Sequence, residues 1–265
     1  MMTTLLIGYG AMGRTVLQQL EVDPGIKVSH VLVPTDQRAA VQHQLGGAVR
    51  VISEVDELSE PPDFAVECAG HGALHDVVPQ LLRRGIDTIV ASVGALAEPG
   101  LPDMLERAAV AGNAQLVLVS GAIPGIDALS AAANARLEDV SYIGRKPPLG
   151  WFGTPAEEKV DLVSLKDATV IFDGSARDAA RLFPKNANVA AIVALAGIGF
   201  DRTRVQLIAD PAANGNIHRL TARGEFGELD VMVAARPLAE NPKTSALAAY
   251  SIIRAARQRA RRIVL

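Results

Sequence analysis

Apolar positions near the start of the chain follow a strand pattern that changes to a helix pattern. Residues 5–7 form a short apolar run, and from residue 14 to residue 20 the apolar side chains recur at helical spacing. Residues 28–33 are again apolar and β-branched, which predicts a second strand. Residues 4–33 therefore form a predicted βαβ unit, which joins two parallel strands.

The same alternation of strand and helix continues to about residue 120. Further short apolar runs predict strands at 49–51, 64–68, 87–92 and 115–119. Helical spacing predicts helices at 75–84, before Gly85, and at about 102–111. Alternating elements with short connections are typical of a doubly wound parallel α/β sheet, so residues 1–120 are predicted to form one such domain.

After residue 125 the pattern predicts a different kind of domain. Helices are expected at 127–137, 175–182 and 189–196. Strands are expected at 140–145, 160–165, 169–172, 204–208, 217–223 and 229–235. We interpret residues 121–242 as an α+β domain with an open, largely antiparallel sheet and helices on one face. Residues 243–262 predict one long amphipathic helix, and we expect the stretch 243–265 to pack back on the first domain.

The turn after the first predicted strand carries a Gly-x-Gly-x-x-Gly motif. Gly8 allows a tight turn, Gly10 lets the backbone approach a diphosphate, and Gly13 lets the following helix pack on the strand. The amides of Ala11 and Met12 would then open the helix, whose N-terminal N–H groups bind phosphate. Such glycines also occur in ordinary turns, but the strand-to-helix context favours a dinucleotide site.

Ligands of open parallel sheets bind outside the carboxyl ends of the strands. These ends are rich in small residues, which allow a flat cofactor to approach. They fall at 8–13, at 69–72 with Ala69 and Gly70, at 92–95, and at 120–125 with Ala122.

Composition narrows the classes of function. The 265 residues carry a net charge of −3, which provides no overall field for nucleic acid or anionic lipid. The single cysteine, Cys68, excludes an internal disulfide framework and a cysteine-based zinc cluster, and it is interpreted as a small buried residue rather than a nucleophile. No signal peptide or membrane-spanning run is recognised, so we expect a cytoplasmic protein. We also expect a small-molecule substrate and no metal.

Three polar features stand out in the second domain. His218 follows the loop at 214–216 and shares the less polar face of its predicted strand with Leu220 and Ala222. There it is either an acid–base group that titrates near neutrality or a half-buried histidine with a satisfied hydrogen bond. Asn186 and Asn188 are either helix caps or ligands, and the basic turn at 145–148 is either exposed or an anion site.

Together these motifs resemble the L-aspartate dehydrogenase family over nearly the whole chain. The resemblance is carried by the glycine turn at 8–13, Arg-Lys-Pro-Pro at 145–148, Pro-Lys-Asn-Ala-Asn-Val-Ala-Ala at 184–191 and Asn-Gly-Asn-Ile-His at 214–218. It implies a Rossmann domain followed by an α+β catalytic domain. It also implies NAD(P)-dependent oxidation of L-aspartate, through iminoaspartate, to oxaloacetate and ammonia, with a place in pyridine nucleotide biosynthesis.

The resemblance implies roles for particular residues. The active-site histidine of the family falls on His218, and cofactor contacts fall on Ala122 and Asn188. The carboxylates of the substrate need cationic partners. Proximity to the motifs gives three unranked candidates, Lys146, Lys185 and Arg219. An open sheet has a face that a second subunit could cover, so we expect a homodimer.

Two alternatives remain at this point. A reductase of the dihydrodipicolinate type would have a similar architecture, although its histidine-rich and paired-lysine segment is not recognised. A dinucleotide sensor without turnover is the other, because fold alone does not establish catalysis.

The preference between NAD and NADP is also open. No acidic residue ends the second strand, Asp36 is a poor substitute, and Arg38 could pair with a 2′-phosphate. We therefore expect NAD and NADP to be used within about a hundredfold of each other, some 2.7 kcal/mol.

Overall fold

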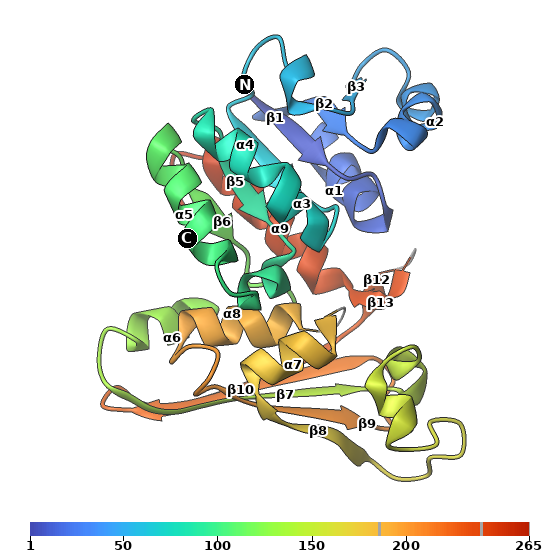
Figure 1. The fold of residues 1–265 in the computed structure, drawn as a ribbon, viewed down its shortest axis with the longest axis vertical. Coiled ribbons are helices and arrows are strands. Elements are labelled where there is room, and N and C mark those ends of the chain that lie inside the picture. Colours follow the sequence, from blue (N-terminus) through green and yellow to red (C-terminus); the bar gives the residue numbers. More distant parts are fainter. Residues whose placement is uncertain (185–186, 239–240, 265) are drawn as a thin grey trace. The chain divides into compact units, whose positions relative to one another are not determined.

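The computed structural model describes residues 1–184, 187–238 and 241–264, and it separates into two compact units (Figure 1). Unit 1 consists of Met1–Val93, Glu98–Val119 and Ala249–Leu265. Unit 2 consists of Gly94–Ala97 and Ser120–Ala248. Each unit has a sheet of its own.

Unit 1 is built on a parallel sheet of six strands in the order β3-β2-β1-β4-β5-β6. The strands are β1 (Met2–Ile7), β2 (Ile26–Leu32), β3 (Arg50–Ile52), β4 (Phe64–Glu67), β5 (Asp87–Val90) and β6 (Leu116–Leu118). The helices are α1 (Ala11–Glu21), α2 (Thr35–Leu45), α3 (His71–Asp76), α4 (Val78–Arg83), α5 (Leu101–Gly112) and α9 (Ala246–Ala260). A short 3₁₀ turn, η1, covers Val55–Glu57. Another, η2, covers Val93–Ala97, of which Gly94–Ala97 belong to unit 2. This strand order is that of a dinucleotide-binding Rossmann fold, which confirms the predicted parallel sheet.

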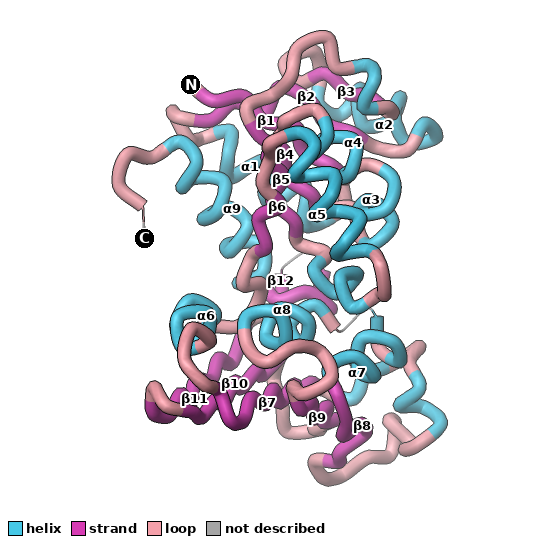
Figure 2. The backbone as a smooth tube through the Cα atoms, turned by 60° about the vertical axis from the view of Figure 1, so that its left-hand side comes forward, coloured by secondary structure: helices cyan, strands magenta, loops and turns pink. Residues whose placement is uncertain are grey.

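The core of unit 1 lies on both faces of its sheet. Alternate residues of β1 point to opposite sides: Leu6 joins one buried cluster, and Leu5 and Ile7 join the other. Buried residues of α9, including Ile252 and Ala256, complete the cluster around Leu6. Helices α1 and α9 lie side by side (Figure 2), and α9 is therefore part of the core of unit 1.

Unit 2 is built on a five-stranded sheet in the order β11-β10-β7-β9-β8. The strands are β7 (Leu137–Lys146), β8 (Thr169–Ser175), β9 (Arg204–Ala209), β10 (Asn216–Gly224) and β11 (Gly227–Ala235). All neighbours are antiparallel except β7 and β9, which are parallel, so the sheet is largely antiparallel as expected.

Helices α6 (Ile126–Ala132), α7 (Ala176–Leu182) and α8 (Asn188–Ala196) lie on one face of this sheet (Figure 1). Two 3₁₀ turns, η3 (Pro148–Trp151) and η4 (Pro155–Glu158), follow β7, and β12 (Pro237–Leu238) pairs with β13 (Asn241–Ser245).

Some predicted elements differ from the structure for local reasons. Residues 160–165 are not a strand, because the Asp161 carboxylate accepts hydrogen bonds from the backbone of Val163 and Ser164 and holds a turn. The helix predicted at 75–84 is divided at Val77, since Pro79 has no N–H to donate to the preceding turn.

Other differences concern element ends. Helix α6 stops at Ala132, where the Asn134 side chain donates to carbonyls of the last turn, so the helix does not reach residue 137. The last helix begins at Ala246 rather than 243, because β13 precedes it. Helix α2 was not predicted, as it buries only Val41 and has almost no apolar face. None of the helices in the described part of the chain combines the length and apolar character that a membrane span needs.

Candidate active site

The glycine turn has the geometry of a diphosphate site. Gly8 has φ +89°, and a Cβ there would lie 2.7 Å from the Cα of Ala69. A Cβ on Gly13 would lie 2.2 Å from the Gly8 carbonyl oxygen, so both positions require glycine. A Cβ on Gly10 would meet no described atom within 4 Å, so the turn leaves open space at the start of α1. Ala11 and Met12 open that helix, whose N-terminus favours an anion. The residues present therefore fit a dinucleotide.

A buried carboxylate holds the ends of β4 and β5 in place. Glu67 is 0% exposed, and its Oε1 accepts hydrogen bonds from the amides of Ala69 and Gly70 at 2.7 and 2.8 Å and from the Ser92 hydroxyl at 2.8 Å. Its Oε2 accepts from the amides of Ala91 and Ser92 at 3.1 and 3.0 Å. The N–H groups of Ala69 and Gly70 are thus used within the protein. Any cofactor contact at these two residues comes from their small size and their carbonyls.

The end of β2 carries an ion pair that bears on cofactor choice. Arg38, in the first turns of α2, lies with Nη2 2.7 Å from Glu57 Oε2 and with Nη1 3.2 Å from Oε1. Glu57 also accepts hydrogen bonds from the Ser53 and Glu54 amides, and these bonds and Arg38 lower its pKa. Arg38 is therefore already paired with a carboxylate at the place where a 2′-phosphate is expected.

His218 lies on strand β10 of unit 2. It shares the buried face of β10 with Leu220 and Ala222, as predicted, and it is only 3% exposed rather than half-buried. Its Nδ1 lies 2.7 Å from the Tyr142 hydroxyl, whereas Nε2 has no hydrogen-bond partner among the described residues. Burial, and then the charge of Lys146, lower the pKa of His218 to about 3. The expectation of titration near neutrality is therefore wrong for the ligand-free site.

Lys146 is the cation that accompanies His218. It ends β7, is 8% exposed and lies 5.2 Å from the centroid of the Trp151 ring. Burial lowers its pKa to about 8. The interpretation of residues 145–148 as an exposed turn is therefore wrong at Lys146, while its neighbour Arg145 pairs with Asp210 at 2.9 Å.

The other two cationic candidates are not brought to this place. Arg219 follows His218 in β10, so its side chain points to the opposite face, where it is exposed and bound to Asp230 through Nε and Nη2. We therefore do not include Arg219 in the site. Lys185, with its neighbour Asn186, lies outside the described residues.

Asn188 does not cap a helix. It is the first residue of α8, and Ala187 occupies the cap position. Asn188 Oδ1 instead accepts a hydrogen bond from the Gly94 amide at 2.9 Å. A contact from Asn188 to a cofactor would consequently be donated by its Nδ2 group. Ala122, the other expected cofactor contact in unit 2, is buried at 4% exposure.

Sequence reasoning missed several residues of these sites: Tyr142, Gly144, Trp151, Glu57 and Glu67. A signal was present for two of them. Tyr142, Gly144 and Lys146 share one face of a strand by alternation, and a glycine inside a strand often marks a close approach. The roles of Glu67 and Trp151 depend on contacts with distant residues.

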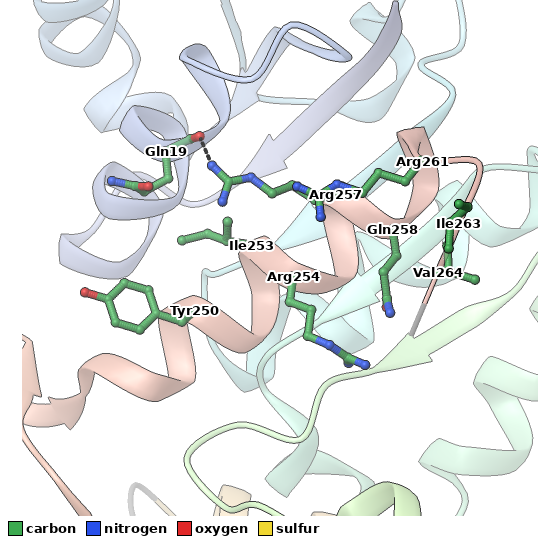
Figure 3. Close-up of a pocket in the computed structure, with 9 residues that line it drawn as sticks. All are labelled: Gln19, Tyr250, Ile253, Arg254, Arg257, Gln258, Arg261, Ile263 and Val264. Carbon is green, nitrogen blue, oxygen red and sulfur yellow. Dashed lines mark hydrogen bonds between the residues drawn. The ribbon is translucent and has the colours of Figure 1, made fainter.

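A separate groove of about 530 Å³ lies along α9 (Figure 3). It is lined by Gln19, Tyr250, Ile253, Arg254, Arg257, Gln258, Arg261, Ile263 and Val264. Arg257 points toward α1, where it donates to the Gln19 carbonyl at 3.0 Å. None of its lining residues belongs to the glycine turn or to the group around His218, so we do not assign the chemistry to it. Within the described residues, no cluster of three or more His, Cys, Asp or Glu could hold a metal ion.

Comparison with known proteins identifies the two halves of the chain. A model of the C-terminal part of aspartate dehydrogenase matches residues 127–259, and a model of the NAD-binding domain of homoserine dehydrogenase matches residues 8–118. A hyperthermophilic archaeal homoserine dehydrogenase, solved with NADPH, has the same fold at 12% identity, with a TM-score of 0.61 over 97% of each chain.

Closer relatives match both halves at once. An L-aspartate dehydrogenase of Pseudomonas aeruginosa is 52% identical over 258 residues, 96% of each chain. One from Cupriavidus taiwanensis is 50% identical over 263 residues, 98% of each chain. The crystal structure of aspartate dehydrogenase from Thermotoga maritima has a TM-score of 0.76 at 28% identity, and the match covers 100% of this chain and 99% of that one. With a glycine turn that fits a dinucleotide, a buried histidine beside a lysine, and this similarity from end to end, the chain belongs to the L-aspartate dehydrogenase family.

Proposed function

We propose that the protein oxidises L-aspartate with NAD(P)⁺ and water to oxaloacetate, ammonium, NAD(P)H and a proton. The observation that carries the proposal is that His218 and Lys146 both lie on the buried face of the sheet of unit 2, close enough for the charge of Lys146 to lower the pKa of His218, in a chain about 50% identical to L-aspartate dehydrogenases. Oxidation of an amino acid requires a group that takes a proton from the substrate ammonium and a cation that binds a substrate carboxylate.

The nicotinamide cofactor, when bound, accepts the hydride from the substrate α-carbon. In this proposal its diphosphate is held by the turn from Gly8 to Gly13, with the amides of Ala11 and Met12 at the start of α1. The carbonyls and small side chains of Ala69 and Gly70 border the cofactor. Ala122 and the Nδ2 group of Asn188 are further cofactor contacts in this proposal.

The substrate is held by charge. Lys146, which retains its proton below pH of about 8, binds one of the aspartate carboxylates as a cation. Lys185 remains a second candidate on its position in the sequence motif. An anionic substrate near these groups favours their protonated forms, so its binding raises the pKa of both His218 and Lys146. The pKa of His218 thereby moves back toward the range in which it exchanges protons.

His218 moves the protons in two steps. Its neutral Nε2, which has no hydrogen-bond partner among the described residues, takes a proton from the substrate ammonium before hydride leaves the α-carbon. The imidazolium releases this proton to solvent before the second step. Neutral Nε2 then takes a proton from the water that adds to the resulting iminium and returns it to the amino group, and the remaining hydroxyl proton leaves with ammonia as ammonium. Because Nδ1 is occupied by Tyr142, the exchange is assigned to Nε2.

The reaction is tested by following nicotinamide absorbance with L-aspartate, and in reverse with oxaloacetate and ammonium, using NAD and NADP. We expect turnover in both directions. A dinucleotide sensor gives no change in absorbance although it binds the cofactor. A reductase of the dihydrodipicolinate type responds to a cyclic imine and not to aspartate.

We further propose that the enzyme is a cytoplasmic homodimer, in which residues 121–242 provide both catalysis and dimerisation. The face of the unit 2 sheet opposite the helices supports this proposal, because it carries Met232, 65% exposed, and an Arg219–Asp230 pair. A second copy that covers this face would bury an exposed apolar side chain. Analytical ultracentrifugation of the wild type and of Met232→Lys tests the assembly. A monomeric wild type would contradict it.

A further inference from the structure

Two residues of β7, Gly144 and Tyr142, determine what lies next to the His218 imidazole. In the antiparallel pairing of β7 with β10, Gly144 lies directly opposite His218, and Tyr142 lies opposite Leu220. Tyr142, Gly144 and Lys146 therefore share the buried face of β7 with His218. With glycine at 144, the position nearest to the imidazole has no side chain.

The Tyr142 hydroxyl fills the space left by that missing side chain. A Cβ on Gly144 would lie 2.6 Å from the Tyr142 hydroxyl oxygen, 3.1 Å from its Cζ and 3.2 Å from Leu207 Cδ2. Tyr142 is 1% exposed, so its ring cannot move away easily. Gly144 lies within a regular strand and is not among the glycines with positive φ. Space, and not backbone conformation, requires glycine here.

The result is a directed contact with one nitrogen of His218. The Tyr142 hydroxyl lies 2.7 Å from Nδ1, and the two ring planes are 19° apart. A neutral imidazole carries its proton on one nitrogen only, and the tyrosine hydroxyl can either donate to Nδ1 or accept from it. Proton uptake by Nε2 in the proposed reaction requires the second arrangement. When Nδ1–H donates to the tyrosine oxygen, Nε2 has a lone pair and can take a proton.

We propose that Tyr142 is a positioning residue that keeps the His218 proton on Nδ1 and leaves Nε2 as the base, and that Gly144 provides the space that this contact needs. The inference rests on the proposed function for its catalytic consequence. After Nε2 takes a proton from the substrate, the Nδ1–H of the imidazolium still donates to the tyrosine oxygen. Tyrosine keeps its own proton throughout, because burial raises the pKa of Tyr142 far above its ordinary value.

Tyr142→Phe tests the proposal because it removes one oxygen and retains the ring. We expect kcat for aspartate oxidation to fall about tenfold, the size of effect that one hydrogen bond has, while the Kd for NADH stays within about twofold. In ¹⁵N NMR spectra of histidine-labelled protein, we expect the His218 proton to move from Nδ1 to Nε2. Tyr250→Phe is the matched control, since Tyr250 is 56% exposed on α9 and should leave both readouts unchanged.

Gly144→Ala tests the space requirement separately. It should displace the hydroxyl and lower kcat, and its effect should be smaller in a Tyr142→Phe background, where the oxygen is absent. An equal effect in both backgrounds overturns the role of Gly144. A Tyr142→Phe enzyme that retains kcat within twofold, or retains the proton on Nδ1, overturns the role of Tyr142. The NMR readout needs no substrate, so a failure of the proposed aspartate reaction is distinguished from a failure of this inference.

Discussion

Asn188 Oδ1 accepts a hydrogen bond from the Gly94 amide, which links the first residue of α8 to a segment 94 positions earlier in the chain. Gly94 follows β5, so this side chain fixes the segment that continues from a strand end of the cofactor-binding sheet. Asn188 thus has two separable capacities: its oxygen holds the chain, and its Nδ2 group remains the candidate cofactor contact.

The two capacities of Asn188 can be measured with two variants. Asn188→Asp keeps an acceptor for Gly94 but loses the donor, so we expect unchanged thermal stability and a higher KM for the cofactor. Asn188→Ala loses the acceptor as well, and we expect it to be less stable by about 1 kcal/mol. Thermal melts and initial rates check both. Full kcat/KM in Asn188→Asp would show that the side chain serves only Gly94.

His218→Asn should lose activity and keep the cofactor. A positioned proton-transfer group contributes about 10² to 10⁴-fold, so we expect kcat to fall by that factor. Binding of NADH, followed by its fluorescence, should be unchanged, because the glycine turn belongs to unit 1 and His218 to unit 2. A folded His218→Asn protein that turns over within about threefold of the wild type would show that the histidine only fills space.

Lys146 should determine the alkaline limb of the pH profile. Because burial lowers its pKa to about 8, kcat/KM for aspartate should decline above that pH, once the ionisation of aspartate itself is allowed for. Lys146→Met should raise KM for aspartate about 10- to 100-fold at pH 7, the range expected for a hydrogen bond to a charged group. The alkaline decline should disappear in Lys146→Met. Its persistence there would contradict the assignment.

Lys146 should also make the free energy of unfolding depend on pH. Its pKa is lowered on folding from 10.5 to about 8, so between these values the unfolded chain binds more protons than the folded one. Stability should therefore rise with pH across this window, by up to about 1.4 kcal/mol per pH unit. Urea unfolding at pH 8 and pH 10 should show this rise in the wild type and not in Lys146→Met.

Glu57 should control the preference between NAD and NADP. It holds Arg38 by two contacts, and a cation released from it could bind a 2′-phosphate. Glu57→Gln should raise the ratio of kcat/KM for NADP to that for NAD several-fold, and Arg38→Gln should lower it. For the wild type we expect a preference below about a hundredfold. A ratio unchanged in both variants would mean that neither residue contacts this part of the cofactor.

Glu67→Gln should destabilise unit 1. The two carboxylate oxygens of Glu67 both accept hydrogen bonds from backbone N–H groups, whereas a glutamine side chain has only one oxygen. Some buried N–H groups therefore lose their acceptor, and each lost acceptor reduces the stability by about 1–3 kcal/mol. Urea unfolding should show a loss of at least about 2 kcal/mol. Glu106→Gln on α5 makes the same chemical change at an exposed position and should be neutral. Equal stability of both variants would contradict the anchoring role.

Short-range patterns in the sequence predicted part of the structure. Apolar periodicity over a few residues predicted the strands of unit 1 and the face of β10 that His218 occupies. The glycine turn was predicted from its motif. The same reasoning failed where a side chain overrides the pattern. Apolar residues at 160–165 suggested a strand, but the Asp161 carboxylate bonds the local backbone.

The electrostatics of the site could not be predicted in this way. The pKa of His218 depends on how completely it is buried and on Lys146, which lies on another strand. The hydrogen-bond partner of Asn188 is a residue 94 positions away in the sequence, whereas the local sequence indicated a helix cap. Only the packed structure brings these residues together.

The return of α9 to the first sheet has a consequence for synthesis. Ile252 and Ala256 complete the core around Leu6, yet they are translated after the whole of unit 2. During translation the cofactor-binding unit therefore lacks part of its core until the last helix leaves the ribosome, whereas unit 2 already has nearly all of its residues. A fragment that ends at residue 119 would expose the apolar surface that α9 covers, and we expect it to aggregate rather than to bind a dinucleotide. Adding residues 246–264 as a separate peptide should restore its solubility.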